Sequence, residues 1–168
     1  MMQYVPMIFR TKPSIPEFDF SGTIAQLGSG IPSARNLKVD TAVFGSIPLG
    51  SLVKAGQGAL AEYVVVPADN VCETPEGTKK DEAAGLGIAG VTALSLLDGA
   101  KLKAGEKVLV YGASGGCGSL ALQLAKDAVG VDGKVVAVCS ERNFGMVKPL
   151  GADEVSNRST ENVSVSLS

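Results

Sequence analysis

The sequence predicts an α/β protein in which a small β-rich region precedes a parallel sheet with flanking helices. In the first part of the chain, short stretches alternate apolar and polar residues, as half-buried antiparallel strands do. In the second part, residues 108–111 and 134–139 form apolar, β-branched runs typical of buried parallel strands. A helix-like segment, residues 119–129, lies between these runs and completes a strand, helix, strand unit.

Three strands are expected in the β-rich region. Residues 18–25 alternate large apolar residues with polar or small ones, and Gly22 indicates a bulge or a close approach of another backbone. Residues 41–44 form a second apolar run, and residues 59–67 give the strongest strand pattern of this region. We expect these strands to pair in an antiparallel sheet.

A turn-rich stretch that contains Pro75 and Gly77 marks the boundary between the two regions. We therefore expect one domain over residues 1–76, a second over residues 77–156, and a polar, serine-rich tail over residues 157–168.

A helical period over residues 81–97 opens the second domain, but three glycines interrupt it: Gly85, Gly87 and Gly90. Each glycine costs a helix about 1 kcal/mol relative to alanine. The sequence therefore predicts a broken helix, or close packing at these glycines. A further helix is expected over residues 144–150 and a third parallel strand over residues 151–155.

A glycine-rich turn follows the first parallel strand and indicates a phosphate site. The window Ala113-Ser114-Gly115-Gly116-Cys117-Gly118 fits the dinucleotide fingerprint G-x-G-x-x-G with alanine in the first place. Small residues at a helix N-terminus leave its backbone N–H groups open to an anion. A plain connecting turn is the alternative. The phosphate loop of nucleotide hydrolases fits less well, because no lysine precedes Ser119.

The end of the second parallel strand distinguishes between cofactors. An NAD site places Asp or Glu there to bind the adenosine ribose, but this chain has Cys139 followed by Ser140. Arg142 and Asn143 could bind a 2'-phosphate, so the pattern favours NADPH over NADH. Glu141 weakens this preference, and Arg142 and Asn143 could also be simple solvated residues of the next helix.

Composition excludes several classes of function. The chain has 168 residues, a formal net charge of -2 and no histidine. No basic surface for nucleic acid or an anionic membrane is expected, and histidine-based catalysis and histidine-ligated zinc are ruled out. The three cysteines are scattered, odd in number and form no C-x-x-C pair, which favours a reduced, cytoplasmic protein without a metal.

Five ordered motifs resemble those of one known family. They are PSIPEFDFSG at residues 13–22, GALAEYVVVP at 58–67, AGVTALSLL at 89–97, GEKVLVYGASGGCG at 105–118, and CSERN at 139–143 with LGADEV at 150–155. Together they are similar to the zinc-free branch of the medium-chain dehydrogenase/reductases, including quinone oxidoreductases and fungal enoyl reductases of secondary metabolism. The resemblance implies a partial GroES-like β domain and a partial Rossmann-type parallel sheet with flanking helices, apparently truncated at both ends.

The resemblance also implies an activity and a set of site residues. NADPH would give hydride to a quinone or to an α,β-unsaturated carbonyl, both small-molecule substrates. Thr92 would lie on the nicotinamide side, and Lys148 would face the same cofactor edge or be solvated. Tyr63 is a weak candidate for catalysis, with a packing role preferred. The cofactor-binding residues implied by position are Thr92, Ser114, Gly115, Gly116, Cys117, Ser140, Arg142 and Asn143.

Three hypotheses for function remain open from the sequence. The first is an NADPH-dependent oxidoreductase. The second is a cofactor-independent biosynthetic enzyme that guides a cyclisation or isomerisation in an apolar cleft. The third is a nonenzymatic fragment that docks on a partner. Unpaired sheet edges also predict a homodimer or a partner-bound chain.

Overall fold

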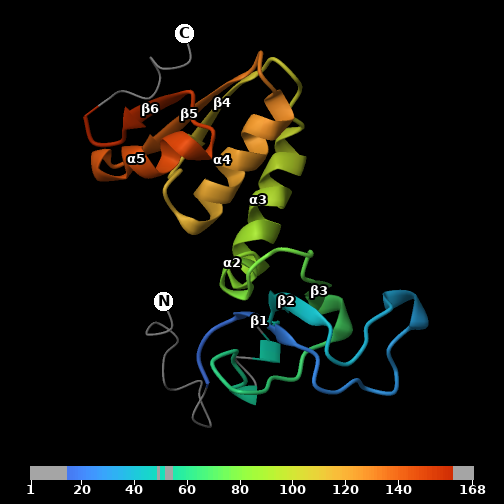
Figure 1. Cartoon of the computed structure of the whole chain (residues 1–168). Helices are drawn as coiled ribbons and strands as arrows, with labels where there is room; N and C mark the ends of the chain where they lie inside the picture. Colours follow the sequence, from blue (N-terminus) through green and yellow to red (C-terminus); the bar gives the residue numbers. More distant parts are fainter. Residues whose placement is uncertain (1–14, 49, 52–54, 161–168) are drawn as a thin grey trace. The chain divides into compact units, whose positions relative to one another are not determined.

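The computed structural model describes residues 15–48, 50–51 and 55–160 (Figure 1). Expectations for residues 1–14 and for residues 161–168 of the predicted tail lie outside this range. Contacts within the chain define two compact units, residues 1–88 and 89–168. This division falls later than the predicted boundary between residues 76 and 77, because α2 (Lys80–Ala84) packs on the first sheet.

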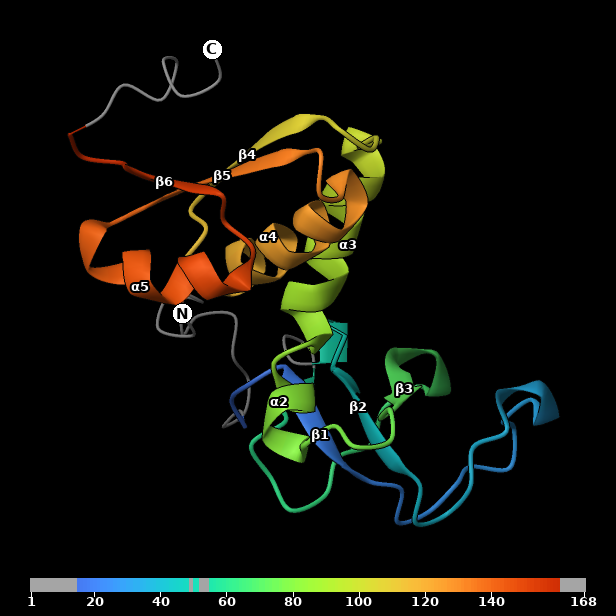
Figure 2. The same ribbon diagram turned by 45° about the horizontal axis from the view of Figure 1, so that its top comes forward.

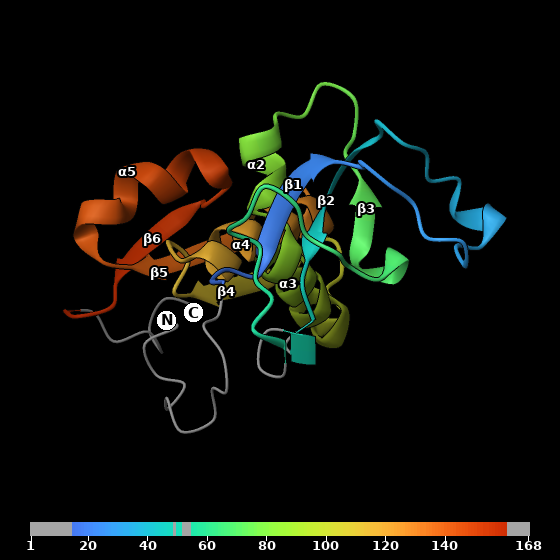
Figure 3. The ribbon, with the colours of Figure 1, turned by 90° about the horizontal axis from the view of Figure 1, so that it is seen from below.

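The first unit contains a three-stranded antiparallel sheet. Its strands are β1 (Asp19–Thr23), β2 (Ala42–Ser46) and β3 (Val71–Glu73), with β2 in the middle (Figure 3). The first two strands and the antiparallel pairing confirm the prediction.

The predicted third strand is wrong, because the structure has no strand over residues 59–67. Val71, which does pair with β2, is 7% exposed, whereas Tyr63 and Val65 are 79% and 82% exposed. A β-branched composition favours a strand only where the side chains meet a paired, half-buried surface. Residues 59–67 lack such a surface among the described residues, so their composition does not produce a strand.

The role predicted for Gly22 is also wrong. The β1 to β2 register runs through Gly22 without a bulge, and a side chain there would meet open space. The close approach in this sheet occurs at Gly45, where an added Cβ would lie 2.0 Å from the backbone oxygen of Asn70.

The predicted helix interruption is confirmed. Helix α2 ends at Ala84, and α3 (Gly87–Ala100) begins after a short turn. At that start, a Cβ on Gly87 would lie 2.4 Å from a carboxylate oxygen of Asp19 and 2.8 Å from the backbone oxygen of Gly45. Gly87 therefore allows the helix to begin close to the sheet.

The second unit is built on a three-stranded parallel sheet. Its strands are β4 (Lys107–Tyr111), β5 (Lys134–Cys139) and β6 (Glu154–Asn157), in the order β4-β5-β6. Helix α4 (Gly116–Val129) connects β4 to β5, and α5 (Phe144–Val147) lies between β5 and β6. Figure 2 shows both helices on one face of the sheet.

The core of this unit lies between α4 and β5. Leu122, Ala125 and Val129 on the helix pack with Val135 and Ala137 on the strand, and all are at most 1% exposed. A fully buried aliphatic side chain contributes about 1.5 to 3 kcal/mol relative to an exposed one. The predicted parallel sheet with flanking helices is confirmed, with element ends shifted by a few residues.

Candidate functional site

The turn after β4 is held against β5. Gly112 has a φ of 76°, which an L side chain rarely adopts, and it turns the chain away from the strand. The backbone N–H groups of Gly112 and Ala113 both donate to the carbonyl of Val138, at 2.9 and 3.1 Å. A third bond joins the N–H of Gly115 to the carbonyl of Gly112 at 2.9 Å. These bonds fix the turn to the end of the neighbouring strand.

In the structure, the glycines of this turn have other roles than the sequence pattern predicts. A Cβ on Gly118 would lie 2.1 Å from the carbonyl oxygen of Gly112, so Gly118 lets the helix pack closely on the turn. The tight-turn glycine is therefore Gly112, a residue that the predicted window, starting at Ala113, left out. The glycine directly after the strand was the signal that could have identified it.

The N-terminus of α4 is open. Gly115 is its N-cap residue, and no side chain caps the helix. Gly115 and Gly116 are exposed, and the N–H of Ser119 is the first to bond back along the helix, to the carbonyl of Gly115 at 2.8 Å. The N–H groups of residues 116–118 therefore precede the first helical acceptor, as an anion site requires. Cys117, in the same turn, is partly exposed.

The end of β5 carries no carboxylate. Cys139, the last strand residue, is 1% exposed, and its burial raises the pKa of the thiol, an effect that the nearby Arg158 partly offsets. A neutral thiol at this place neither repels a phosphate nor accepts strongly from a ribose. Ser140 follows at the surface, half-buried.

Arg142 lies in the short 3-10 turn Glu141–Asn143 that follows the strand, and it is exposed. Within the described residues, no carboxylate or carbonyl accepts a hydrogen bond or ion pair from its guanidinium. The neighbouring Glu141 is also exposed. A free guanidinium beside the strand end fits a phosphate group.

One hydrogen bond joins the two predicted halves of the cofactor site. The side-chain amide of Asn143 donates to the Ser114 hydroxyl at 2.9 Å, and both residues are partly buried. The structure thus brings together the glycine turn and the residues that follow β5. The residues present fit a dinucleotide, because an open helix N-terminus, free N–H groups and an unpaired cation occur within one unit.

Three other predicted residues lie on other elements of the chain. Thr92 is partly buried on α3, and Lys148 is exposed in the 3-10 turn Lys148–Leu150 after α5. Tyr63 belongs to the other unit and is 79% exposed. Among the residues that the structure covers, no group of three or more His, Cys, Asp or Glu side chains could hold a metal ion.

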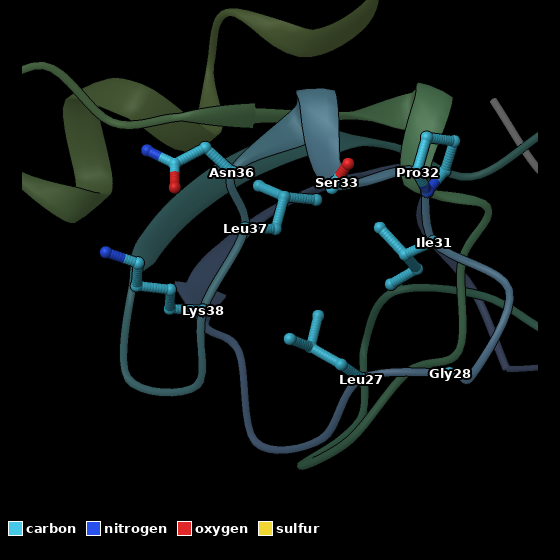
Figure 4. Close-up of a pocket in the computed structure, with 8 residues that line it drawn as sticks. All are labelled: Leu27, Gly28, Ile31, Pro32, Ser33, Asn36, Leu37 and Lys38. Carbon is cyan, nitrogen blue, oxygen red and sulfur yellow. The ribbon is translucent and has the colours of Figure 1, made fainter.

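A small hollow in the first unit contains none of the predicted site residues. Its volume is about 250 Å³, and Figure 4 shows the side chains of Leu27, Ile31 and Leu37 around it. The hollow lies in the loop between β1 and β2. It adds nothing to the cofactor cluster, which belongs to the second unit.

Known proteins show the same fold. Residues 2–76 match the alcohol dehydrogenase GroES-like domain. A trans-enoyl reductase of Penicillium oxalicum is 35% identical over 161 residues, covering 84% of this chain and 41% of the relative. The chloroplast envelope quinone oxidoreductase homolog of Arabidopsis thaliana is 40% identical over 156 residues, covering 89% and 44%.

Solved structures of similar proteins show the same relationship. The quinone oxidoreductase from Coxiella burnetii superposes with a TM-score of 0.78 at 32% identity, covering 94% of this chain and 47% of that one. Over the matched residues, the chain is similar to quinone oxidoreductases and enoyl reductases of the medium-chain dehydrogenase/reductase family. It spans less than half the length of the curated relatives it matches.

One of the similar solved structures contains a nicotinamide cofactor. The yhdH oxidoreductase from Salmonella enterica, solved in complex with NADP, superposes with a TM-score of 0.68 at 31% identity, covering 89% of this chain and 44% of that one. None of the helices in the described residues has the length and apolarity needed to cross a membrane.

Proposed function

We propose that this chain binds the adenosine half of NADPH and belongs to an oxidoreductase that reduces a quinone or an α,β-unsaturated carbonyl. The observation that carries the proposal is the hydrogen bond between Asn143 and Ser114, which unites the glycine turn with the residues after β5. Support also comes from relatives that are quinone oxidoreductases and enoyl reductases. An origin in secondary metabolism and a cytoplasmic location are further parts of this proposal.

The chain's own residues would bind and orient the cofactor. The N–H groups of residues 116–118, at the start of α4, would bind the pyrophosphate. Arg142 and Ser140 would bind the 2'-phosphate, since charge-assisted hydrogen bonds of this kind contribute roughly 1.5 to 3 kcal/mol each. When bound, the nicotinamide ring supplies the hydride. Orientation is the main task left to the protein, because hydride transfer needs no protein acid at the accepting carbon.

Calorimetric titration of the purified chain with NADPH and, separately, with NADH tests the proposal. Binding of NADPH at least about tenfold tighter than NADH is expected, because one phosphate contact with Arg142 is worth that much. The variant Arg142→Ala should remove most of this difference and leave NADH unaffected. A matched control is Arg158→Ala, in which the other described arginine of the second unit is changed.

Failure of the folded chain to bind either cofactor would contradict the proposal. It would direct attention to a cofactor-independent enzyme or to a docking fragment. If NADPH binds, the next measurement is its oxidation in the presence of quinones and enones. Clear binding without turnover on any of them would limit the chain to a binding role.

A further inference from the structure

The Ser114 hydroxyl is a donor with no acceptor in the described part of the chain. A serine hydroxyl has one hydrogen to donate and two lone pairs that accept. One lone pair of Ser114 receives the Asn143 amide at 2.9 Å. The hydroxyl hydrogen itself is directed to no atom of the residues described.

Ser119, one turn further along, provides a contrast. Its hydroxyl donates to the carbonyl of Gly116 at 3.1 Å, so its hydrogen is already used within the helix. Ser114 therefore differs from Ser119 in a way that matters for an external ligand. Its hydrogen is free and lies in the turn that leads to the open N–H groups of residues 116–118.

Backbone hydrogen bonds at the end of β5, or directly after it, flank both sides of the Asn143–Ser114 bond. On one side, Gly112 and Ala113 donate to the carbonyl of Val138. On the other side, the N–H of Asn143 donates to the carbonyl of Ser140 at 2.9 Å, within the turn that follows the same strand. The backbone on both sides of the Ser114 hydroxyl is therefore hydrogen-bonded within the second unit.

The geometry points to Asn143 as a positioning residue: its amide occupies a lone pair of Ser114 and turns the Ser114 hydroxyl hydrogen toward the pyrophosphate of the bound dinucleotide. This assignment rests on the proposed function, and it gives Asn143 a role other than direct contact with the 2'-phosphate. A hydroxyl that already accepts a hydrogen bond is also a stronger donor, because neighbouring bonds polarise each other. Because every nicotinamide dinucleotide has a pyrophosphate, Asn143 should assist NADPH and NADH equally.

A double-mutant cycle measured by calorimetry with NADPH and with NADH tests this role. Asn143→Ala and Ser114→Ala should each weaken both cofactors by a similar factor, about threefold to tenfold. The double variant should bind no worse than Ser114→Ala alone, since Asn143 acts through that hydroxyl. Ser119→Ala is the matched control and should change neither affinity. Thermal unfolding of each variant establishes that it is folded.

Asn143→Asp provides a second, independent comparison. The carboxylate keeps the shape of the side chain but accepts instead of donating, so the Ser114 hydrogen would turn to it and away from the pyrophosphate. Weaker binding of NADH as well as NADPH is expected, with the larger loss for NADPH because the new carboxylate also repels its 2'-phosphate. A loss confined to NADPH would place Asn143 against the 2'-phosphate and overturn the assignment.

The outcomes separate the two proposals. If the unmodified chain binds a dinucleotide but the effects of Asn143→Ala and Ser114→Ala add together, the positioning role is wrong and the proposed function stands. If the folded chain binds neither cofactor, the proposed function and the positioning role are both removed.

Discussion

The carboxylate of Asp19 accepts a hydrogen bond of 2.9 Å from the backbone N–H of Ile88, so a side chain from β1 satisfies a donor in the first turn of α3. These residues are 69 positions apart in the chain. A helix N-terminus normally obtains such a partner from its own N-cap side chain. Here Gly87 allows the helix to approach the strand, and the strand supplies the partner.

Removing the Asp19 carboxylate should destabilise the chain. We expect Asp19→Ala to lower the free energy of unfolding by about 1 to 2 kcal/mol, as loss of an N-cap acceptor does. Asp19→Asn keeps an accepting oxygen and should retain most of the stability. Urea unfolding of both variants measures the difference. An equal loss in both variants would show that the hydrogen bond is not responsible.

The pH dependence of Asp19 has a defined sign. Desolvation raises the pKa of this carboxyl, the hydrogen bond from Ile88 lowers it in part, and Glu17 raises it further. Because the folded-state pKa is raised, ionisation at neutral pH costs stability, and the cost disappears as the pH falls below 3.8. The free energy of unfolding of Asp19→Asn minus that of the unmodified chain should therefore be larger at pH 7 than in acid.

Asp153 should give the opposite pH dependence. It accepts from Lys126 Nζ at 2.9 Å and from the N–H of Val135 at 2.7 Å. Desolvation raises the pKa of Asp153, but these bonds and the charges of Lys126 and Lys134 outweigh it and lower the pKa. The ionised Asp153 carboxylate therefore stabilises the folded chain fully at pH values above 3.8. This stabilisation is lost as the pH falls through the lowered pKa of Asp153.

Urea unfolding of the unmodified chain and of Asp153→Asn, at pH values from neutral to strongly acid, measures this effect. The variant should be less stable at neutral pH, and the difference should shrink in acid. Lys107→Gln is a control, because Lys107 has no ion pair in the described residues. A constant difference across the pH range would contradict the prediction.

Gly118 is required because a side chain at this position would overlap the turn that precedes the helix, and not because of its backbone angles. We expect Gly118→Ala to destabilise the chain by about 1 to 3 kcal/mol, because the new methyl group would overlap the carbonyl of Gly112. It should also weaken NADPH binding. Gly145→Ala is the matched control: it lies in α5 with nothing within 4 Å, and alanine there should stabilise by up to about 1 kcal/mol. Thermal unfolding compares the two variants, and equal changes would contradict the packing argument.

Thr74 carries a buried hydroxyl that has no hydrogen-bond partner among the residues that the structure describes. Replacing it with valine removes the unsatisfied oxygen and keeps the shape of the side chain. We expect Thr74→Val to raise the free energy of unfolding by about 1 kcal/mol, the cost of an unpaired buried polar group. Urea unfolding tests this expectation, and a loss of stability would mean that the hydroxyl has a partner in solution.

The outer strands of the parallel sheet predict association. In the described chain, β4 and β6 each pair on one side only. Unpaired backbone N–H and C=O groups favour pairing with another chain, so we expect a homodimer. Light scattering at several protein concentrations measures the mass, and a monomer at every concentration would contradict this expectation.

Elements with local sequence signals could be predicted without the structure. The apolar run of β5 needs burial on both faces wherever it lies, and its predicted bounds match the structure. Gly85, Gly87 and Gly90 predicted a broken helix or close packing, because each lowers helix propensity; the chain leaves the helix at Gly85, whereas Gly87 and Gly90 lie within α3. The glycine turn and the candidate cofactor residues were likewise identified from short motifs.

The segment that completes the first sheet, and the hydrogen bond that joins the two halves of the candidate site, depend on tertiary packing. Strand formation depends on a partner, so Val71–Glu73 pairs with β2 while the more strand-like residues 59–67 do not form a strand. The bonds of Asn143 to Ser114 and of Ile88 to Asp19 link residues far apart in sequence. No local pattern encodes such contacts, because they exist only after the strands and helices have packed.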